Sequence, residues 1–432
     1  MYQYQGRTWL VACLVSTLYL AEGWPYVLVN SVSVLLLKDL GVSNPMIAVL
    51  TSCFYLPWML KMFWASFVDV WWEQRVWIIW TQIVMGGLLC TCGLCLVLIG
   101  KGSLVFVLTL LFLGLAFCSA THDIAVDGYY IRALSEGEQA HFLGWRVFWY
   151  RVAMVCGSGG VLLSVGVVQE QWGWDFRWSW MLACGLSGVC LMALSLFHAM
   201  VLEKTVKQEH DVKAKNTWED AFRAFFIQSG ILGLLVFLLF FRFGEALLLR
   251  MSKPFLRDPQ VAGGLGLSNV TIGWIEGAGV TALTLGGLWG GVALKRWGLR
   301  SCRMWMCLSM TLPNTVYVWV SVVPMSDLCV GLLLCLEQLG YGIGLMLFTM
   351  IVLRIAKRSS YESAFFAMGT GLMTLGLLLP GMISGGLWSI LGYPWFFGVS
   401  LFLSLCGGGT LWLLPKWVFE EDKPKISATC PG

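Results

Sequence analysis

Long apolar segments recur along the whole chain, and they constrain its fold more than any other feature. A helix needs about 20 apolar residues to cross a bilayer. Twelve segments reach that length, at 8–36, 45–67, 76–99, 104–125, 142–168, 178–202, 231–249, 270–294, 304–323, 328–355, 363–388 and 395–414. The sequence therefore predicts an all-α membrane protein with twelve transmembrane helices.

The few charged residues support this prediction and exclude other classes. Only 12% of the residues are charged, against about 25% in soluble domains. The net charge of +4 comes without a long basic run, so no nucleic-acid partner is predicted. Most cysteines, including Cys90, Cys92 and Cys95, lie inside apolar segments and are expected to behave as small hydrophobes. We therefore expect no metal site and no cofactor.

Loop charges predict the orientation in the membrane. The loops on the side of the termini hold most of the Lys and Arg residues between the segments, while the opposite loops hold only Lys38, Lys101, Arg177, Lys253 and Arg257. Basic loops stay in the cytoplasm. Both termini of this multi-pass protein are therefore predicted to be cytoplasmic, in the cell inner membrane. The first apolar segment is too long for a signal peptide and is expected to remain as the first span.

A repeat divides the chain near a polar segment at 203–220. Gly-Val-Ser-Asn at 41–44 returns as Gly-Leu-Ser-Asn at 266–269, and Trp64 with Trp289 and Arg75 with Arg300 keep the same spacing. Each Ser-Asn pair is predicted to supply the N-cap of a helix. Parallel halves of this kind are typical of the major facilitator fold. We predict two six-helix halves at 1–202 and 229–414, a cytoplasmic linker at 203–228 and a cytoplasmic tail at 415–432.

Charged residues meet in the segment from 116 to 154. Asp123 and Asp127 are four residues apart and share a helix face. Arg146 and Arg151 follow after the turn, with Tyr150 between them. Charges inside a span are costly unless they are paired or face water, so they indicate function. The alternative for Asp127 and Arg146 is a place among the lipid headgroups.

Other spans carry acids that are candidates for proton coupling. Glu22 lies in the first span, Glu245 follows Arg242 by three residues, and Glu276 and Glu337 lie in the eighth and tenth spans. A carboxyl group buried away from cations can bind and release a proton near neutral pH. The proton-coupling candidates are Asp123, Glu337, Glu276, Asp127 and Glu22. The main candidates are Asp123, Glu337 and Glu276, and the alternative for each of these three is a structural carboxyl group.

Two further features relate to motion between the halves. Asp69 and Arg75 lie in a short cytoplasmic loop and are predicted to latch neighbouring helix ends as a gate, although a solvated turn is the alternative. Small residues allow helices to cross closely. We therefore expect close crossings at two glycine-rich stretches, formed by Gly157, Gly159 and Gly160 and by Gly340, Gly342 and Gly344.

Several motifs resemble those of one transporter family. Residues 116–127 read A-F-C-S-A-T-H-D-I-A-V-D, Tyr150-Arg151 precede Met154, and the other matches are K-x-x-W-x-x-x-x-D at 61–69, R-x-G-E at 242–245 and E-x-L-x-x-G-x-G at 337–344. The set is similar to the AmpG-type muropeptide permeases, major facilitators related to acetyl-CoA transporters. The resemblance implies proton-driven uptake of anhydro-muropeptides, which are fragments released by cell-wall turnover.

The chain also departs from that family. The family's Ser-Pro before the loop acid is Ala65-Ser66, and its arginine after that acid is Val70. These departures leave a second substrate class open, namely another anionic solute such as an acyl-CoA-like or nucleotide-like metabolite.

The sequence therefore predicts a secondary active transporter and not an enzyme, because it carries no His-rich metal cluster, no partnered Ser nucleophile and no P-loop. Its expected partners are a small anionic solute, protons and the lipid bilayer, and we expect a functional monomer. The substrate-binding candidates are Arg146, Tyr150, Arg151, Arg242 and Glu245.

Overall fold

A computed structural model describes residues 8–203, 214–358 and 362–419, and every regular element within them is helical. The first part holds α1 (Thr8–Val27), η1 (Leu28–Val32), α2 (Ser33–Asp39), α3 (Asn44–Cys53), α4 (Leu56–Leu60), η2 (Lys61–Phe63), α5 (Ala65–Trp71), α6 (Gln74–Leu98), α7 (Lys101–Ala133), α8 (Glu136–Val155), η3 (Cys156–Gly160), α9 (Val161–Trp172) and α10 (Phe176–Val201). The second holds α11 (Ala214–Ile227), α12 (Ile231–Phe240), α13 (Phe243–Arg257), η4 (Gln260–Ala262), α14 (Asn269–Thr311), η5 (Leu312–Asn314), α15 (Thr315–Val320), α16 (Asp327–Lys357), α17 (Glu362–Gly409), η6 (Thr410–Leu413) and η7 (Lys416–Phe419).

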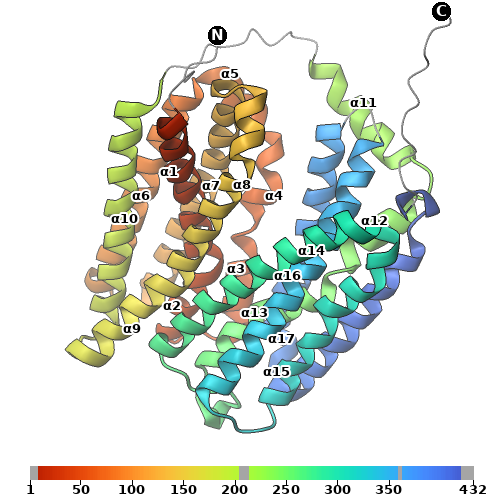
Figure 1. Ribbon diagram of the computed structural model, residues 1–432. Helices are drawn as coiled ribbons and strands as arrows, with labels where there is room; N and C mark the ends of the chain where they lie inside the picture. The colour runs from red at the N-terminus through yellow and green to blue at the C-terminus, as the bar shows by residue number, and fades with distance from the viewer. Residues whose placement is uncertain (1–7, 204–213, 359–361, 420–432) are drawn as a thin grey trace, which may run out of the picture.

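The helices form two bundles that lie side by side (Figure 1). Elements α1 to α10 make up the N-terminal bundle, and α12 to α17 make up the C-terminal bundle. In Figure 1 the bundles lie apart at the end where the chain termini are drawn, and they converge at the opposite end.

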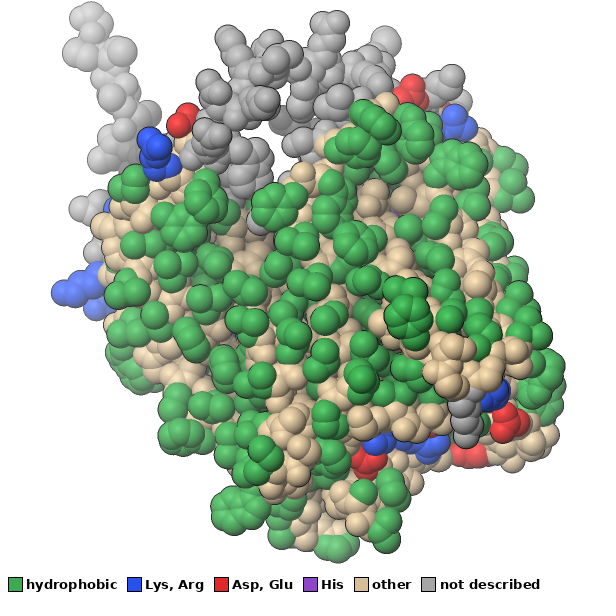
Figure 2. Space-filling view, turned by 180° about the vertical axis from the view of Figure 1, so that it is seen from behind, with side chains coloured by type: hydrophobic (Ala, Val, Ile, Leu, Met, Phe, Trp, Pro, Cys, Tyr) green, Lys and Arg blue, Asp and Glu red, His purple; other side chains and the backbone are tan. Residues whose placement is uncertain are grey.

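The exterior suits a hydrocarbon environment. Nine helices in the described parts of the chain are long and apolar enough to cross a membrane. Figure 2 shows hydrophobic side chains spread over the middle of the face in view, with the visible charged side chains mostly near its two ends. Lipid offers no hydrogen bonds to the backbone, so a crossing segment must satisfy its own N–H and C=O groups, as a helix does. The prediction of an all-α membrane protein is confirmed.

Glycines divide two of the longest helices. Gly298 within α14 has φ 73° and Gly392 within α17 has φ 70°. Side chains disfavour this left-handed region, whereas glycine enters it readily. Each glycine therefore lets the chain turn between two apolar helices.

The predicted seventh span was too short. The sequence placed its end at residue 249, but the apolar helix continues from Ile231 to Arg257. Lys253 and Arg257, expected in a loop, are therefore helical residues that form ion pairs inside the protein. The fourth span is also longer, because α7 continues to Ala133 and includes Asp127.

Glycines bring helices into close contact, as the glycine-rich stretches predicted. A Cβ atom on Gly342 would lie 2.1 Å from the Leu283 carbonyl oxygen, and one on Gly157 would lie 2.2 Å from Val27 Cγ1. These contacts join α16 to α14, and η3 to the first span. Gly160 differs, since a Cβ atom there would meet nothing within 4 Å.

Candidate functional site

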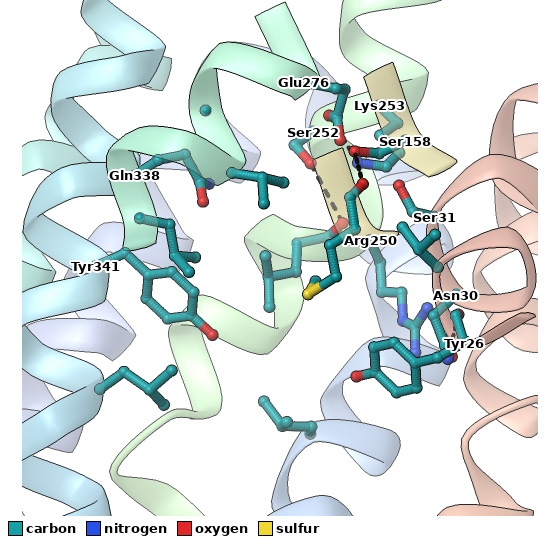
Figure 3. A pocket seen from close by; sticks show the side chains of 18 of the residues that line it. Tyr26, Asn30, Ser31, Ser158, Arg250, Ser252, Lys253, Glu276, Gln338 and Tyr341 are labelled. Atoms are coloured by element: carbon teal, nitrogen blue, oxygen red, sulfur yellow. Dashed lines mark hydrogen bonds and ion pairs between the residues drawn. The ribbon is translucent and has the colours of Figure 1, made fainter. Parts of the chain in front are cut away.

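A cavity of about 460 Å³ lies between the two bundles. Its N-terminal wall comes from the first span, from α3–α4 and from α8–η3, and its C-terminal wall comes from α13 to α17. Figure 3 shows Asn30, Ser31 and Ser158 on one side of this space and Gln338 and Tyr341 on the other. Both bundles therefore contact whatever occupies the cavity.

Two arginines of the cavity wall are not neutralised. Arg250 of α13 is only 8% exposed, and its guanidinium carbon lies 4.5 Å from the Tyr55 ring centroid. Arg151 of α8 contacts the Met154 sulfur at 3.5 Å. Neither forms an ion pair with a carboxylate of the described residues. An unpaired charge loses several kcal/mol on burial, whereas a cation–π contact returns only about 0.5–2 kcal/mol. The wall therefore carries positive charge that an anion would neutralise.

Two other cations of the C-terminal bundle are paired. Arg242 donates to both carboxylate oxygens of Glu245, at 3.1 and 2.6 Å, and also to the Tyr341 hydroxyl. Lys253 Nζ lies 2.7 Å from Glu276 Oε1. Arg242, Lys253 and Glu276 line the cavity, while Glu245 lies behind Arg242. These pairs make the wall polar without adding to its net charge.

Glu337 is the buried acid of the C-terminal bundle that has no cation beside it. It is 3% exposed, and its Oε2 accepts a hydrogen bond from Gln338 Nε2 at 2.9 Å. Gln338 lines the cavity. Glu337 is therefore one amide group away from the cavity wall.

The N-terminal bundle holds a group of acids and bases beside the cavity. Asp123 Oδ2 accepts from Trp58 Nε1 at 3.0 Å and lies 3.6 Å from Lys61 Nζ. Trp58 lines the cavity. Lys61 therefore lies close to a carboxylate of the same bundle.

Asp127 and Arg146 form an ion pair in the same bundle. Arg146 lies 3.0 Å from Asp127 Oδ1, which also accepts from the Tyr19 hydroxyl at 3.0 Å. The Arg146 guanidinium carbon sits 4.6 Å from the Tyr19 ring centroid. Neither member of the pair lines the cavity, so the structure does not bring Arg146 to the wall that holds Tyr150 and Arg151.

Glu22 is the buried acid of the N-terminal bundle without a close cation. It is 9% exposed, and its Oε2 is buried with no hydrogen-bond partner in the described chain. A buried carboxylate without a partner is costly, whereas a protonated carboxyl group is not. Among the described residues, Glu22 of the first bundle and Glu337 of the second are therefore buried carboxyl groups that form no ion pair.

Aromatic side chains form much of the N-terminal wall. Tyr26 lies 5.1 Å from Trp58, 6.4 Å from Tyr55 and 6.2 Å from Tyr150, measured between ring centroids. All four line the cavity. Such rings offer flat apolar faces together with polar edges.

A polar cluster joins the bundles at the end opposite the termini. We call it the clamp, and it consists of Lys38, Asp39, Asn44, Arg257, Asp258 and Asn269. Arg257 Nε lies 2.8 Å from Asp39 Oδ1, and Lys38 forms an ion pair with Asp258. Both pairs link one bundle to the other, so they hold the bundles together at this end.

The predicted gating loop is only partly described. The side chain of Asp69 lies outside the described set, so its pairing is untested. Arg75 at the start of α6 donates to the Ala199 carbonyl oxygen near the end of α10, at 2.6 Å. It therefore ties two helix ends of one bundle together.

Sequence reasoning missed Arg250 and Lys253. Both follow the last apolar run of the seventh span, where charges normally signal a loop. The available signal was the spacing, because residues 242, 246, 249, 250 and 253 repeat at helical intervals and all line the cavity. Because the seventh span was predicted to end at residue 249, the clamp residue Arg257 was also assigned to a loop and the clamp was not predicted.

Comparisons with known proteins agree with this architecture. The model of the Major Facilitator Superfamily matches residues 13–380. The chain is 24% identical over 415 residues to a putative transporter AmpG 4 of Rickettsia conorii, covering 89% of this chain and 92% of the relative. It is 23% identical over 350 residues to the anhydromuropeptide permease of Escherichia coli K12, covering 78% of this chain and 66% of that protein.

Solved structures share the fold. A D-xylose-proton symporter aligns with a TM-score of 0.72 at 8% identity, covering 95% of this chain and 99% of that one. A nucleoside transporter aligns with a TM-score of 0.69 at 16% identity, covering 94% and 99%. At such identities the likeness concerns the fold alone.

Proposed function

The chain belongs to the major facilitator superfamily, and from this premise we propose that it is a proton-coupled importer of anhydro-muropeptides. It is a membrane transporter of small solutes, as its family and its transporter relatives establish. The observation that carries the proposed substrate is the cavity wall, where two unpaired guanidiniums stand beside four aromatic rings. Carboxylates match guanidinium groups, and sugar rings have flat faces that suit aromatic rings.

The proposed architecture has twelve spans. The nine long apolar helices become eleven when α14 and α17 are each divided at their glycine, and the apolar helices of Asn44–Leu60 add the twelfth. The proposed halves are 1–202 and 229–414, joined by the linker at 203–228 and followed by the tail at 415–432. From the loop charges we place both termini in the cytoplasm. We further propose that the protein is a monomer in the inner membrane.

Alternating access explains how such a molecule would move its solute. The clamp closes the end opposite the termini, so the cavity is proposed to open toward the cytoplasm in this state. Opening the clamp and closing the other end would expose the same cavity to the outside. Glu22 and Glu337 are the proposed proton carriers, and Asp123, Asp127 and Glu276 are proposed to tune the site through their cations.

Uptake into vesicles tests the proposal. Labelled anhydro-muropeptide is supplied to proteoliposomes with and without an imposed pH gradient. Accumulation that needs the gradient is expected. Absence of muropeptide accumulation, together with accumulation of a labelled acyl-CoA or nucleotide in the same vesicles, would instead favour the other anionic substrate class.

A further inference from the structure

Arg250 of the C-terminal bundle and Arg151 of the N-terminal bundle both line the cavity. We propose that they form one carboxylate-binding site that is completed only when the bundles close around an acidic solute. This inference rests on the proposed function for its solute, but the pair of arginines is identified from the geometry alone. It assigns Arg250 a binding role that the sequence did not suggest.

The surroundings of Arg250 are built to present its charge to the cavity. Its guanidinium stacks against Tyr55 of the opposite bundle, at 4.5 Å from the ring centroid. Figure 3 shows that guanidinium beside Tyr26 and Asn30. A guanidinium cannot lose its proton at any relevant pH. The positive charge therefore persists at this position whether or not a solute is bound.

The wall beside the Arg250 guanidinium holds two polar atoms without hydrogen-bond partners among the described residues. Asn30 donates to the Tyr26 carbonyl oxygen at 3.0 Å through its Nδ2, which leaves its Oδ1 buried without a partner in the described chain. Ser31 Oγ is likewise buried and unpartnered among the described residues. Both atoms belong to residues that line the cavity. The two atoms are themselves buried, so they would meet hydroxyl or amide groups of a solute only after a shift of their side chains.

The backbone around these atoms is also unusual. Asn30 and Ser31 lie in the π-helix η1, and Ser158 of the cavity lies in a second π-helix, η3. Such segments are rare and occur frequently at functional sites. The two π-helices meet where Gly157 lies against Val27. Taken with the two guanidiniums, the aromatic rings and the polar atoms of Asn30 and Ser31, the solute class that fits this site is a carboxylate carried on a hydroxyl- or amide-bearing ring.

A carboxylate held by both arginines would couple binding to motion. Each bundle contributes one guanidinium, so the closed arrangement binds the anion with two partners and an open arrangement binds it with one. A ligand shifts a conformational equilibrium only through such a difference in affinity. A neutral solute of the same shape would lack this effect.

The test compares an acid with its ester. The purified full-length protein in detergent is titrated with anhydro-N-acetylmuramic acid and with the methyl ester of the same compound, and the dissociation constants are measured by calorimetry. The wild type is expected to bind the acid about tenfold more tightly than the ester. Arg250→Gln should remove this preference, so that the acid binds no more tightly than the ester.

Further variants guard against misfolding and against general charge effects. Arg250→Lys keeps the charge but loses the planar fork, so an intermediate preference is expected. Arg296→Gln removes an exposed arginine outside the cavity and should retain the full preference. Each variant is first checked for monodispersity and for an unchanged unfolding temperature.

Two results would overturn the inference. They are equal binding of acid and ester by the wild type, and a preference that survives in Arg250→Gln. If neither compound binds, the proposed substrate is wrong. The anion site is then tested by comparing the dissociation constants of uridine monophosphate and uridine. The same preference and its loss in Arg250→Gln are expected for that pair, and the absence of a preference there would also contradict the arginine site.

Discussion

Asp39 and Asp258 hold matching sets of partners across the boundary between the bundles. Asp39 accepts from Arg257 and Asn269 of the opposite bundle and from Trp180 of its own, at 2.8, 2.9 and 2.9 Å. Asp258 pairs with Lys38 and accepts from Asn44 of the opposite bundle, and Tyr393 of its own bundle donates at 2.5 Å. Each aspartate thus has one cation, one asparagine and one aromatic donor.

This match makes the clamp a reciprocal device, in which each half presents an acid and a base to the other. Asp39 and Asp258 are 3% and 6% exposed as side chains, so the two carboxylates are shielded from water, while Arg257 and Lys38 are 29% and 16% exposed. Removing one partner of a buried pair costs about 3–5 kcal/mol because the other charge remains. That range is comparable to the energy gaps of a few kcal/mol that separate conformations of a protein, so losing one partner is enough to shift the balance between two conformations.

Neutralising the clamp should open the end opposite the termini. We expect Asp39→Asn and Asp258→Asn each to raise the rate at which a membrane-impermeant thiol reagent reaches a cysteine placed in the cavity by Ser31→Cys, by about tenfold or more. Labelling is applied from the side opposite the termini and is read by mass spectrometry of the peptide that contains residue 31. An unchanged rate in both variants would show that the clamp does not hold this end closed. The exposed Asp175 supplies a matched control, because Asp175→Asn should leave the rate unaltered.

Glu22→Gln and Glu337→Gln should separate proton coupling from solute movement. Glutamine preserves the size of each side chain but cannot release a proton. We therefore expect accumulation driven by a pH gradient to fall at least about tenfold, while exchange of solute across the membrane at equal pH continues. Both rates are measured in the same proteoliposomes with labelled solute. Gradient-driven accumulation at wild-type levels would remove that residue as a proton carrier.

Asp123→Asn should abolish proton-driven uptake while expression persists. The change leaves Lys61 without the carboxylate that lies 3.6 Å away, next to the cavity residue Trp58. An uncompensated cation at this depth disturbs the balance of charge on which protonation of the neighbouring acids depends. Uptake and the amount of protein in the membrane are measured together. Normal uptake would exclude Asp123 from the mechanism.

Arg242 and Glu245 should behave as a unit in stability. Arg242 is 6% exposed and Glu245 is 4% exposed, and two hydrogen bonds join them. Arg242→Met alone is expected to destabilise the protein by about 3–5 kcal/mol, because Glu245 keeps a buried charge. The double change Arg242→Met with Glu245→Leu should recover most of this loss. Unfolding temperatures report both effects, and equal losses in the single and double variants would contradict the coupling.

The asparagines of the repeat illustrate what the sequence can and cannot reveal. The Ser-Asn pairs were predicted from local chemistry as helix caps, and Ser268 does accept from the Thr271 backbone N–H. Ser43 occupies the same position without a side-chain cap bond. Asn44 and Asn269 instead reach the clamp acids. The repeat in the sequence marks Asn44 and Asn269 as equivalent positions. Their contacts with acids in distant segments depend on the tertiary structure and cannot be read from the sequence.

The charged end of the seventh span shows a second limit. Apolar length locates the spans because lipid contact demands it. A helix end that faces protein can carry charged residues such as Arg250 and Lys253. A prediction based on apolar length therefore assigns them wrongly to a loop. The acids Glu22 and Glu337 were recognised because each interrupts a long apolar run, and charge inside such a run is informative by itself. Partners such as Trp58 and Gln338 become evident only from the fold.

The close contact of α14 with α16 gives a final prediction that needs no solute. A Cβ atom on Gly286 would lie 2.1 Å from the Leu339 carbonyl oxygen, whereas one on Gly291 of the same helix would meet nothing within 4 Å. Gly286→Ala must push the two helices apart, and overpacking of this kind typically costs about 1–3 kcal/mol. Gly291→Ala should be neutral or should stabilise the helix by up to about 1 kcal/mol, since alanine favours helices. Unfolding temperatures of the two variants in one detergent provide the measurement. If both variants unfold at the same temperature, the close crossing is not a determinant of stability, and the glycines of this helix would need another explanation.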